Sequence, residues 1–264
     1  MKLFTAFLLC AIGAVCSAQD WALKKLEASP RHQEWVAVEH DNRKVMTFVV
    51  YPEVKEKAPV VILIHEIFGM TDWVRNLADQ FAAAGYIAVA PDLLSGMGPN
   101  GGRTDSVEAS KVGEVIRALP PAQITADLNA VADYAKTIPA GNFKIAVAGF
   151  CWGGSQAWRF ATNRLDLSYA FPFYGTAPDS ENQLSKIVAP VYGFYAENDM
   201  RINATLPETT DRMRKLGKFF EATTYAGAGH GFMRAGEAPN ASEENAKARK
   251  AAWDKVMELL AKLR

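Results

Sequence analysis

The sequence predicts an α/β domain with a mostly parallel central sheet that is covered by helices on both faces. Segments typical of strands and of helices alternate along the chain, and this order produces parallel strands joined by helical crossovers. Val60–His65 is a continuous apolar run, as expected of a central parallel strand that is buried on both sides. Residues 19–264 contain no charged or low-complexity linker, so we expect a single domain.

The first two strands are predicted to form an antiparallel hairpin, and the later strands to run parallel. Glu34–His40 and Lys44–Val50 flank a short polar turn. The further strands are expected at Val60–His65, Tyr86–Ala90, Lys144–Ala148, Leu167–Phe173, Val191–Tyr195 and Phe219–Tyr225. The helices are expected at Asp72–Ala84, Ser106–Leu119, Ala122–Thr137, Ser155–Ala161, Leu206–Leu216 and Ser242–Leu263.

Residues 1–18 have the composition of a secretory signal peptide. Lys2 gives a short positive start, Leu3–Val15 is apolar, and small residues end at Ala18. The apolar stretch is too short to span a bilayer comfortably. We therefore expect cleavage after Ala18 and an exported protein, periplasmic or secreted, with no membrane attachment afterwards. Lipoprotein processing at Cys16 is an alternative, although residues 13–15 match the usual preceding residues poorly.

Cleavage would leave Cys151 as the one thiol of the mature chain, because Cys10 and Cys16 lie in the signal segment. A single cysteine in an exported protein cannot form an internal disulfide, so a reactive thiol is favoured. Gly149–Gly153 places Cys151 where a G-x-S-x-G nucleophile elbow places its serine, between a predicted strand and a predicted helix. The plain alternative is a small buried residue, since free cysteine is often buried.

A thiol nucleophile requires a base and an acid that orients the base. His230 is the one histidine after Cys151, and it lies in a glycine-rich loop after the last predicted strand. Asp199 follows the strand Val191–Tyr195, which gives the order nucleophile, acid, histidine. Glu197 is a nearby competitor for the acid, and the alternative role of Asp199 is ordinary turn formation.

These motifs together resemble the dienelactone hydrolase family of α/β-hydrolases. The matching residues are Gly149–Gly154, Glu66–Gly69, Pro91–Leu93, Asp199 and Gly229–Arg234, in family order across nearly the whole mature chain. The resemblance implies an α/β-hydrolase fold with Cys151 as nucleophile, His230 as base and Asp199 as its acid. It also implies that Glu66 holds the resting thiol and that the backbone N–H groups of Ile67 and Trp152 form the oxyanion hole.

The residues around Glu66 are consistent with that role. A carboxyl group at the end of a central strand, beside apolar neighbours, is poorly solvated and exchanges a proton readily with a thiol. Its alternative role is a salt bridge at the rim. We expect His65, Tyr86 and Trp152 to surround the reacting groups.

The cations of the predicted site depart from the family pattern. Lactone-cleaving members carry an arginine in the loop after Pro-Asp-Leu, whereas this chain continues Leu94-Ser95-Gly96. Arg103 lies further along that loop and is a candidate replacement. Arg234 matches the second family arginine, and we expect it to bind a substrate carboxylate.

The sequence therefore predicts a hydrolase that cleaves a small ester or lactone through a thioacyl enzyme. Lys plus Arg and Asp plus Glu both number 29, so no basic field favours nucleic acid or membrane binding. No clustered ligands predict a metal, and the G-x-G-x-x-G match at 96–101 does not join a strand tightly to a helix, so we expect no cofactor. The alternatives are a non-catalytic ligand-binding relative and a redox-active thiol protein. The oligomeric state is left open.

Overall fold

The computed structural model describes residues 19–264 of the chain. The predicted signal peptide, including Cys10 and Cys16, lies outside the described residues. Export, cleavage and lipoprotein processing therefore stay predictions.

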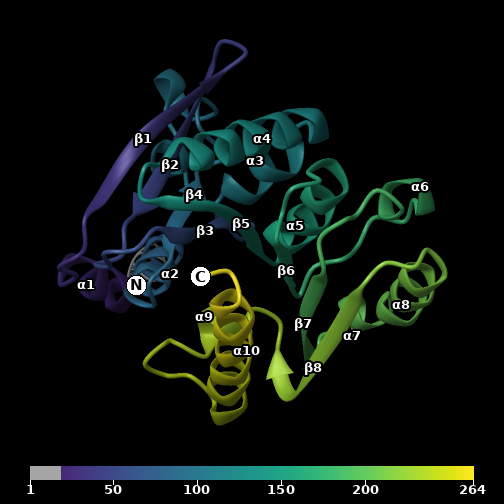
Figure 1. Cartoon of the computed structure of the whole chain (residues 1–264). Helices are drawn as coiled ribbons and strands as arrows, with labels where there is room; N and C mark the ends of the chain where they lie inside the picture. The colour runs from purple at the N-terminus through teal and green to yellow at the C-terminus, as the bar shows by residue number, and fades with distance from the viewer. Residues whose placement is uncertain (1–18) are drawn as a thin grey trace, which may run out of the picture.

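The described residues form one eight-stranded sheet in the order β1-β2-β4-β3-β5-β6-β7-β8 (Figure 1). The first two pairings, β1 with β2 and β2 with β4, are antiparallel, and the remaining pairings are parallel. The strands are β1 (Gln33–His40), β2 (Arg43–Val50), β3 (Ala58–Ile64), β4 (Ile87–Pro91), β5 (Gly141–Phe150), β6 (Tyr169–Phe173), β7 (Val191–Asn198) and β8 (Phe220–Gly229). The predicted mostly parallel sheet and the predicted hairpin are both confirmed.

Helices cover both faces of the sheet (Figure 1). The longer ones are α1 (Asp20–Glu27), α2 (Asp72–Ala83), α3 (Val112–Ala118), α4 (Pro121–Thr137), α5 (Trp152–Asn163), α8 (Leu206–Lys215) and α10 (Glu243–Ala261). The short ones are η2 (Pro99–Gly101), η3 (Thr104–Ser106), α6 (Glu181–Leu184), α7 (Met200–Asn203) and α9 (Phe232–Ala235). In β3, Ile62 and Ile64 pack toward α4 and α5, while Val61 and Leu63 pack toward α2 and α10. All four side chains are fully buried, which explains the unbroken apolar run in the sequence.

The helix predicted at Ser106–Leu119 is wrong in its first half, because α3 begins only at Val112. The buried carboxylate of Asp92 accepts hydrogen bonds from the backbone and the hydroxyl of Thr104, which holds the preceding segment against the sheet. The chain then turns once more, with the Lys111 N–H bonded to the Glu108 carbonyl at 2.8 Å, before the helix starts.

The C-terminal boundaries also differ from those predicted. Strand β8 continues beyond Tyr225 to Gly229, because Gly229 pairs with Asn198 of β7 after a register shift. The short helix α9 lies in a segment that was expected to be a loop, and α1 was not anticipated. Within residues 19–264, no helix has the length and apolar character needed to cross a membrane.

Candidate active site

Cys151 occupies a sharp turn between β5 and α5. Its backbone has φ 56° and ψ −116°, a conformation that costs free energy for any residue other than glycine, and its N–H donates to the Phe173 carbonyl at 3.1 Å. A Cβ atom on Gly149 would collide with the Gly153 carbonyl, and one on Gly153 would collide with the Ile64 carbonyl. The glycines of the motif are therefore required by backbone contact, and the turn holds Cys151 at the carboxyl end of the sheet.

The structure brings His230 and Asp199 together at the same edge of the sheet. Asp199 follows β7 and His230 follows β8, and these neighbouring strands end side by side. The imidazole Nδ1 of His230 lies 2.5 Å from Oδ2 of the buried Asp199. Glu197 instead accepts a hydrogen bond from the Gly227 N–H at 2.7 Å, so Asp199 is the one of the two candidate acids that contacts the histidine.

The interaction with the Cys151 side chain, together with the Asp199 carboxylate, raises the pKa of His230 to about 9, against an opposing effect of partial burial. The negative charge of a neighbouring carboxylate favours the protonated form of an imidazole. The raised pKa favours the protonated imidazole of His230 at neutral pH, and this imidazole interacts with the only cysteine of the described residues.

Two backbone N–H groups near Cys151 are without acceptors. Those of Ile67 and Trp152 make no hydrogen bond to any group within residues 19–264. Trp152 is the first residue of α5, so its N–H lacks an intrahelical partner. Ile67 follows β3, and β3 pairs with β5 so that Ile64 lies opposite Gly149. Both N–H groups are thus at the strand ends that flank Cys151 and are available to a developing oxyanion.

Glu66 is paired with Arg234. The Arg234 Nε donates to Oε2 of Glu66 at 2.7 Å, and the guanidinium carbon lies 5.2 Å from the ring centre of Phe68. Burial raises the pKa of the Glu66 carboxyl, while Arg234 acts in the opposite direction. No hydrogen bond joins Glu66 to Cys151 among the contacts of the described chain, so the role of Glu66 as partner of the resting thiol stays a prediction. Glu66 does form the salt bridge that the sequence left as an alternative, but its carboxylate is buried and does not lie at the rim.

Arg103 does not take the place of the missing loop arginine. Its guanidinium lies 3.7 Å from the ring centre of Trp35 on β1, and its Nε donates to Asp105 at 3.0 Å. It lines a separate hollow of about 780 Å³ with Arg43 and Lys44, and none of Cys151, Asp199 and His230 lines that hollow. Arg234 is therefore the arginine that the structure places beside the site.

Of the three residues expected around the reacting groups, His65 and Trp152 are there and Tyr86 is not. The ring of His65 is stacked on that of Trp152, with centres 5.5 Å apart and planes at 16°. Tyr86 directly precedes β4 and so lies at the opposite, amino-terminal edge of the sheet, where the Arg264 guanidinium covers its ring. The expectation for Tyr86 is wrong because Tyr86 lies at the start of its strand, whereas the site lies where the parallel strands end.

Sequence reasoning missed Tyr174, which follows β6 at the carboxyl edge. Its ring is fully buried and lies edge-on to that of His230, with centres 4.9 Å apart. Its hydroxyl has no hydrogen-bond partner among residues 19–264. Burial raises the pKa of Tyr174 far above its usual range, and the nearby Glu66 and Cys151 act in the same direction. A polar residue directly after a predicted parallel strand is the sequence signal that could have identified it.

In the part of the chain that the structure describes, no group of three or more His, Cys, Asp or Glu side chains is arranged to hold a metal ion. Four of the ionisable side chains at the site are instead engaged in the two pairs already described, His230 with Asp199 and Arg234 with Glu66.

The sheet order and the elbow after β5 define an α/β-hydrolase. The model of the dienelactone hydrolase family matches residues 45–263, and the chain belongs to that family. Two curated relatives described as "Putative carboxymethylenebutenolidase" are each 30% identical: that of Salmonella typhi over 77% of both chains, and that of Methylorubrum extorquens over 66% of this chain and 63% of its own.

A solved structure from Klebsiella pneumoniae, titled as a "Putative Dienelactone Hydrolase", has the same fold. It superposes with a TM-score of 0.76 at 24% identity and covers 88% of this chain and 98% of its own. Family membership and these relatives together support an ester or lactone hydrolase.

Proposed function

We propose that this protein hydrolyses a small ester or lactone through a covalent thioacyl enzyme formed on Cys151. The observation that carries the proposal is the His230–Asp199 contact of 2.5 Å at the same sheet edge as the strained elbow of Cys151. A histidine that is oriented by a buried acid and interacts with a thiol is the arrangement that activates a cysteine nucleophile.

The proposed reaction has two halves. The Cys151 thiolate attacks the substrate carbonyl carbon, an S–C bond forms, and the carbonyl π pair moves to the oxygen, which the N–H groups of Ile67 and Trp152 receive. The C–O bond to the leaving group then breaks, and the protonated His230 gives its proton to the departing alkoxide. In the second half His230 takes a proton from water, the hydroxide adds to the thioester, and the thiolate leaves as the acid product forms.

Two alternatives from other classes are less well supported. A redox-active thiol would not require an aspartate and a histidine in contact beside it, and a non-catalytic relative would be expected to lack a member of this set. Ser155 is a poor replacement nucleophile, because its hydroxyl already accepts from the Thr176 N–H at 2.9 Å. Labelling of Cys151 by an activated ester, with and without peroxide treatment, separates the hydrolase from the redox protein.

The direct test is hydrolysis of short-chain aryl esters by Cys151→Ala and His230→Ala variants. We expect each to lose roughly 10³-fold or more of kcat, because residues that act as one unit fail together. The double variant should be no worse than the worse single variant. Circular dichroism should show an unchanged fold, since neither side chain belongs to the fully buried core.

The matched control is Ser155→Ala, which removes a neighbouring hydroxyl of α5 and should retain most of the activity. If Cys151→Ala kept most of the wild-type turnover, the proposed nucleophile would be wrong. A loss in Cys151→Ala with full activity in His230→Ala would instead remove the histidine from the mechanism.

A further inference from the structure

We infer that His65 is a positioning residue that fixes both oxyanion N–H groups of the site. The inference rests on the proposed function, because it assigns His65 to the peptide unit that carries the first N–H and to the side chain of the residue that carries the second. His65 directly follows β3, its side chain is fully buried, and neither the triad nor the Glu66–Arg234 pair makes use of it.

The first step concerns the peptide unit between Glu66 and Ile67. The Nδ1 of His65 lies 2.8 Å from the Glu66 carbonyl oxygen, which also accepts from the Gly69 N–H at 3.1 Å. A peptide unit is planar, and in a trans unit the C=O and the following N–H point in opposite directions. A carbonyl held by two donors therefore also fixes the direction of the Ile67 N–H.

The second step assigns the proton on the imidazole. The Leu93 N–H lies 3.4 Å from Nε2 of His65, and an N–H can only donate, so Nε2 is the unprotonated nitrogen. The proton is then on Nδ1, where the Glu66 carbonyl accepts it. Burial lowers the pKa of His65, with Asp92 acting in the opposite direction, so the ring is neutral. Both ring nitrogens are thus engaged by the backbone in a single tautomer.

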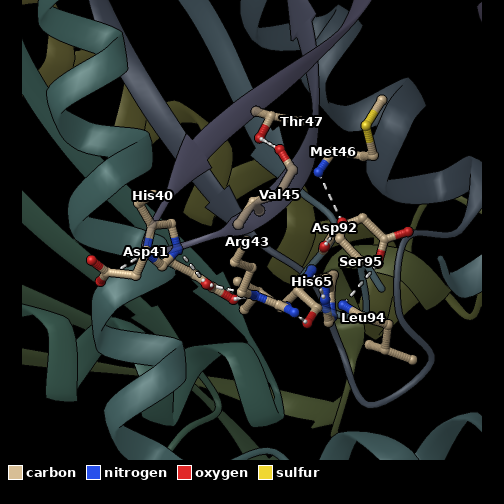
Figure 2. Close-up of polar contacts among 12 residues, drawn as sticks. His40, Asp41, Arg43, Val45, Met46, Thr47, His65, Asp92, Leu94 and Ser95 are labelled. Atoms are coloured by element: carbon tan, nitrogen blue, oxygen red, sulfur yellow. Dashed lines mark hydrogen bonds and ion pairs between the residues drawn. The ribbon is translucent and has the colours of Figure 1, made fainter. Parts of the chain in front are cut away.

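The third step concerns what holds the histidine itself. The Leu93 carbonyl accepts from Arg43 of β2 at 3.2 Å, and the Arg43 Nε in turn donates to the buried Asp127 at 2.8 Å. Figure 2 shows Arg43 beside His65, close to the segment after β4 on which Asp92 and Leu94 lie. Arg43 of the antiparallel strand β2 therefore holds in place the Leu93 segment, whose N–H donates to Nε2 of His65.

The fourth step connects the ring to the other oxyanion donor. The imidazole is stacked on the indole of Trp152, and the backbone N–H of the same residue is the second proposed donor. One side chain thus bonds the peptide unit that carries the first N–H and packs on the residue that carries the second. Because a preorganised donor is effective only when aimed at the developing charge, loss of His65 should weaken transition-state binding while the substrate still binds.

Four variants separate this role from simple packing. His65→Phe keeps a ring against Trp152 and loses both hydrogen bonds. His65→Asn places an amide near the position of Nδ1, whereas His65→Gln places one near the position of Nε2. Thr47→Val is the matched control, because it removes a fully buried side chain-to-backbone hydrogen bond on β2 without touching the oxyanion peptide.

We expect His65→Phe to lower kcat roughly 10- to 100-fold with KM nearly unchanged, somewhat less than the loss on deleting a donor outright. His65→Asn should recover most of this loss and His65→Gln little of it. Affinity for an aryl trifluoromethyl ketone, which adds to the thiolate to form an anionic thiohemiketal, should fall with kcat. Alkylation of Cys151 by iodoacetamide, which forms no oxyanion, should be unchanged.

Equal behaviour of His65→Phe and Thr47→Val would overturn the inference, as would equal impairment of the Asn and Gln variants. If His65→Phe does not fold, the comparison of Asn with Gln decides the question alone. Failure of the proposed function gives a different result, namely wild-type ester hydrolysis that persists in Cys151→Ala.

Discussion

The ion pair of Arg234 with Glu66 fixes the position of the arginine and leaves part of its guanidinium available to a substrate. The Nε of Arg234 is engaged by Glu66, and the guanidinium also lies near the half-exposed ring of Phe68. A planar guanidinium can bind one carboxylate through Nε and present its terminal NH₂ groups to another. The pair therefore allows Arg234 to recognise an anionic substrate, with Glu66 fixing its position.

We predict that Arg234→Ala lowers kcat/KM for a carboxylate-bearing ester by about 1.5–3 kcal/mol, the value of a hydrogen bond to a charged group. A neutral ester of the same size should be affected little, since only one arginine is available and neutral substrates do not require it. The ratio of kcat/KM for the two matched substrates is the measurement. An equal loss on both would show that Arg234 supports the loop and does not recognise charge.

His230 gives the folded state a pH dependence of known sign. Its pKa is about 9 in the folded protein and about 6.5 in an unfolded chain. A group whose folded-state pKa is raised stabilises the fold fully below the unfolded value, and this contribution is lost as the pH rises through the folded value.

We therefore predict that the difference in free energy of unfolding between the wild type and His230→Gln is largest below about pH 6.5 and shrinks toward pH 9. Urea unfolding at several pH values measures it. A difference that is independent of pH, or that grows with pH, would contradict the account of this histidine.

At the level of elements, the sequence predicted the strands that carry the site better than the segments that connect them. The run Val60–His65 and the elbow at Gly149–Gly153 were identifiable because burial on both faces and a tight turn each leave a local pattern. The end of β8 was not, because Gly227–Gly229 resemble a loop until their pairing with β7 is known. The strand after Tyr86 was also predicted correctly, but Tyr86 was wrongly assigned to the edge of the sheet that carries the site.

The clamps of the site were also beyond sequence reasoning. The contact of Arg43 with the Leu93 carbonyl joins residues 50 positions apart, and that of Arg234 with Glu66 joins residues 168 apart. No local pattern encodes such pairs, because each depends on the order of strands in the sheet. The proposed triad could be suggested from the sequence only because its members follow a fixed chain order at strand ends.

At the level of the whole molecule, the segment after α9 is bonded to the two helices α2 and α10, which cover the same face of the sheet. Glu237, just after α9, accepts hydrogen bonds from Asn76 and Gln80 of α2 at 3.0 and 2.7 Å, and pairs with Arg249 of α10 at 3.1 Å. This buried carboxylate ties α9, which carries Arg234, to two long helices. Helices α2 and α10 therefore hold in place the short helix α9, which lies beside α10 (Figure 1).

The central claim is that a thioester forms on Cys151. The most direct measurement is intact-protein mass spectrometry after rapid mixing with a p-nitrophenyl ester, followed by peptide mapping. The account predicts a transient mass increase of one acyl group, located on Cys151, that accumulates and then decays at the rate of turnover and is absent from Cys151→Ala. Steady hydrolysis by the wild type with no acyl group on Cys151 at any time, or with the acyl group on another residue, would contradict it.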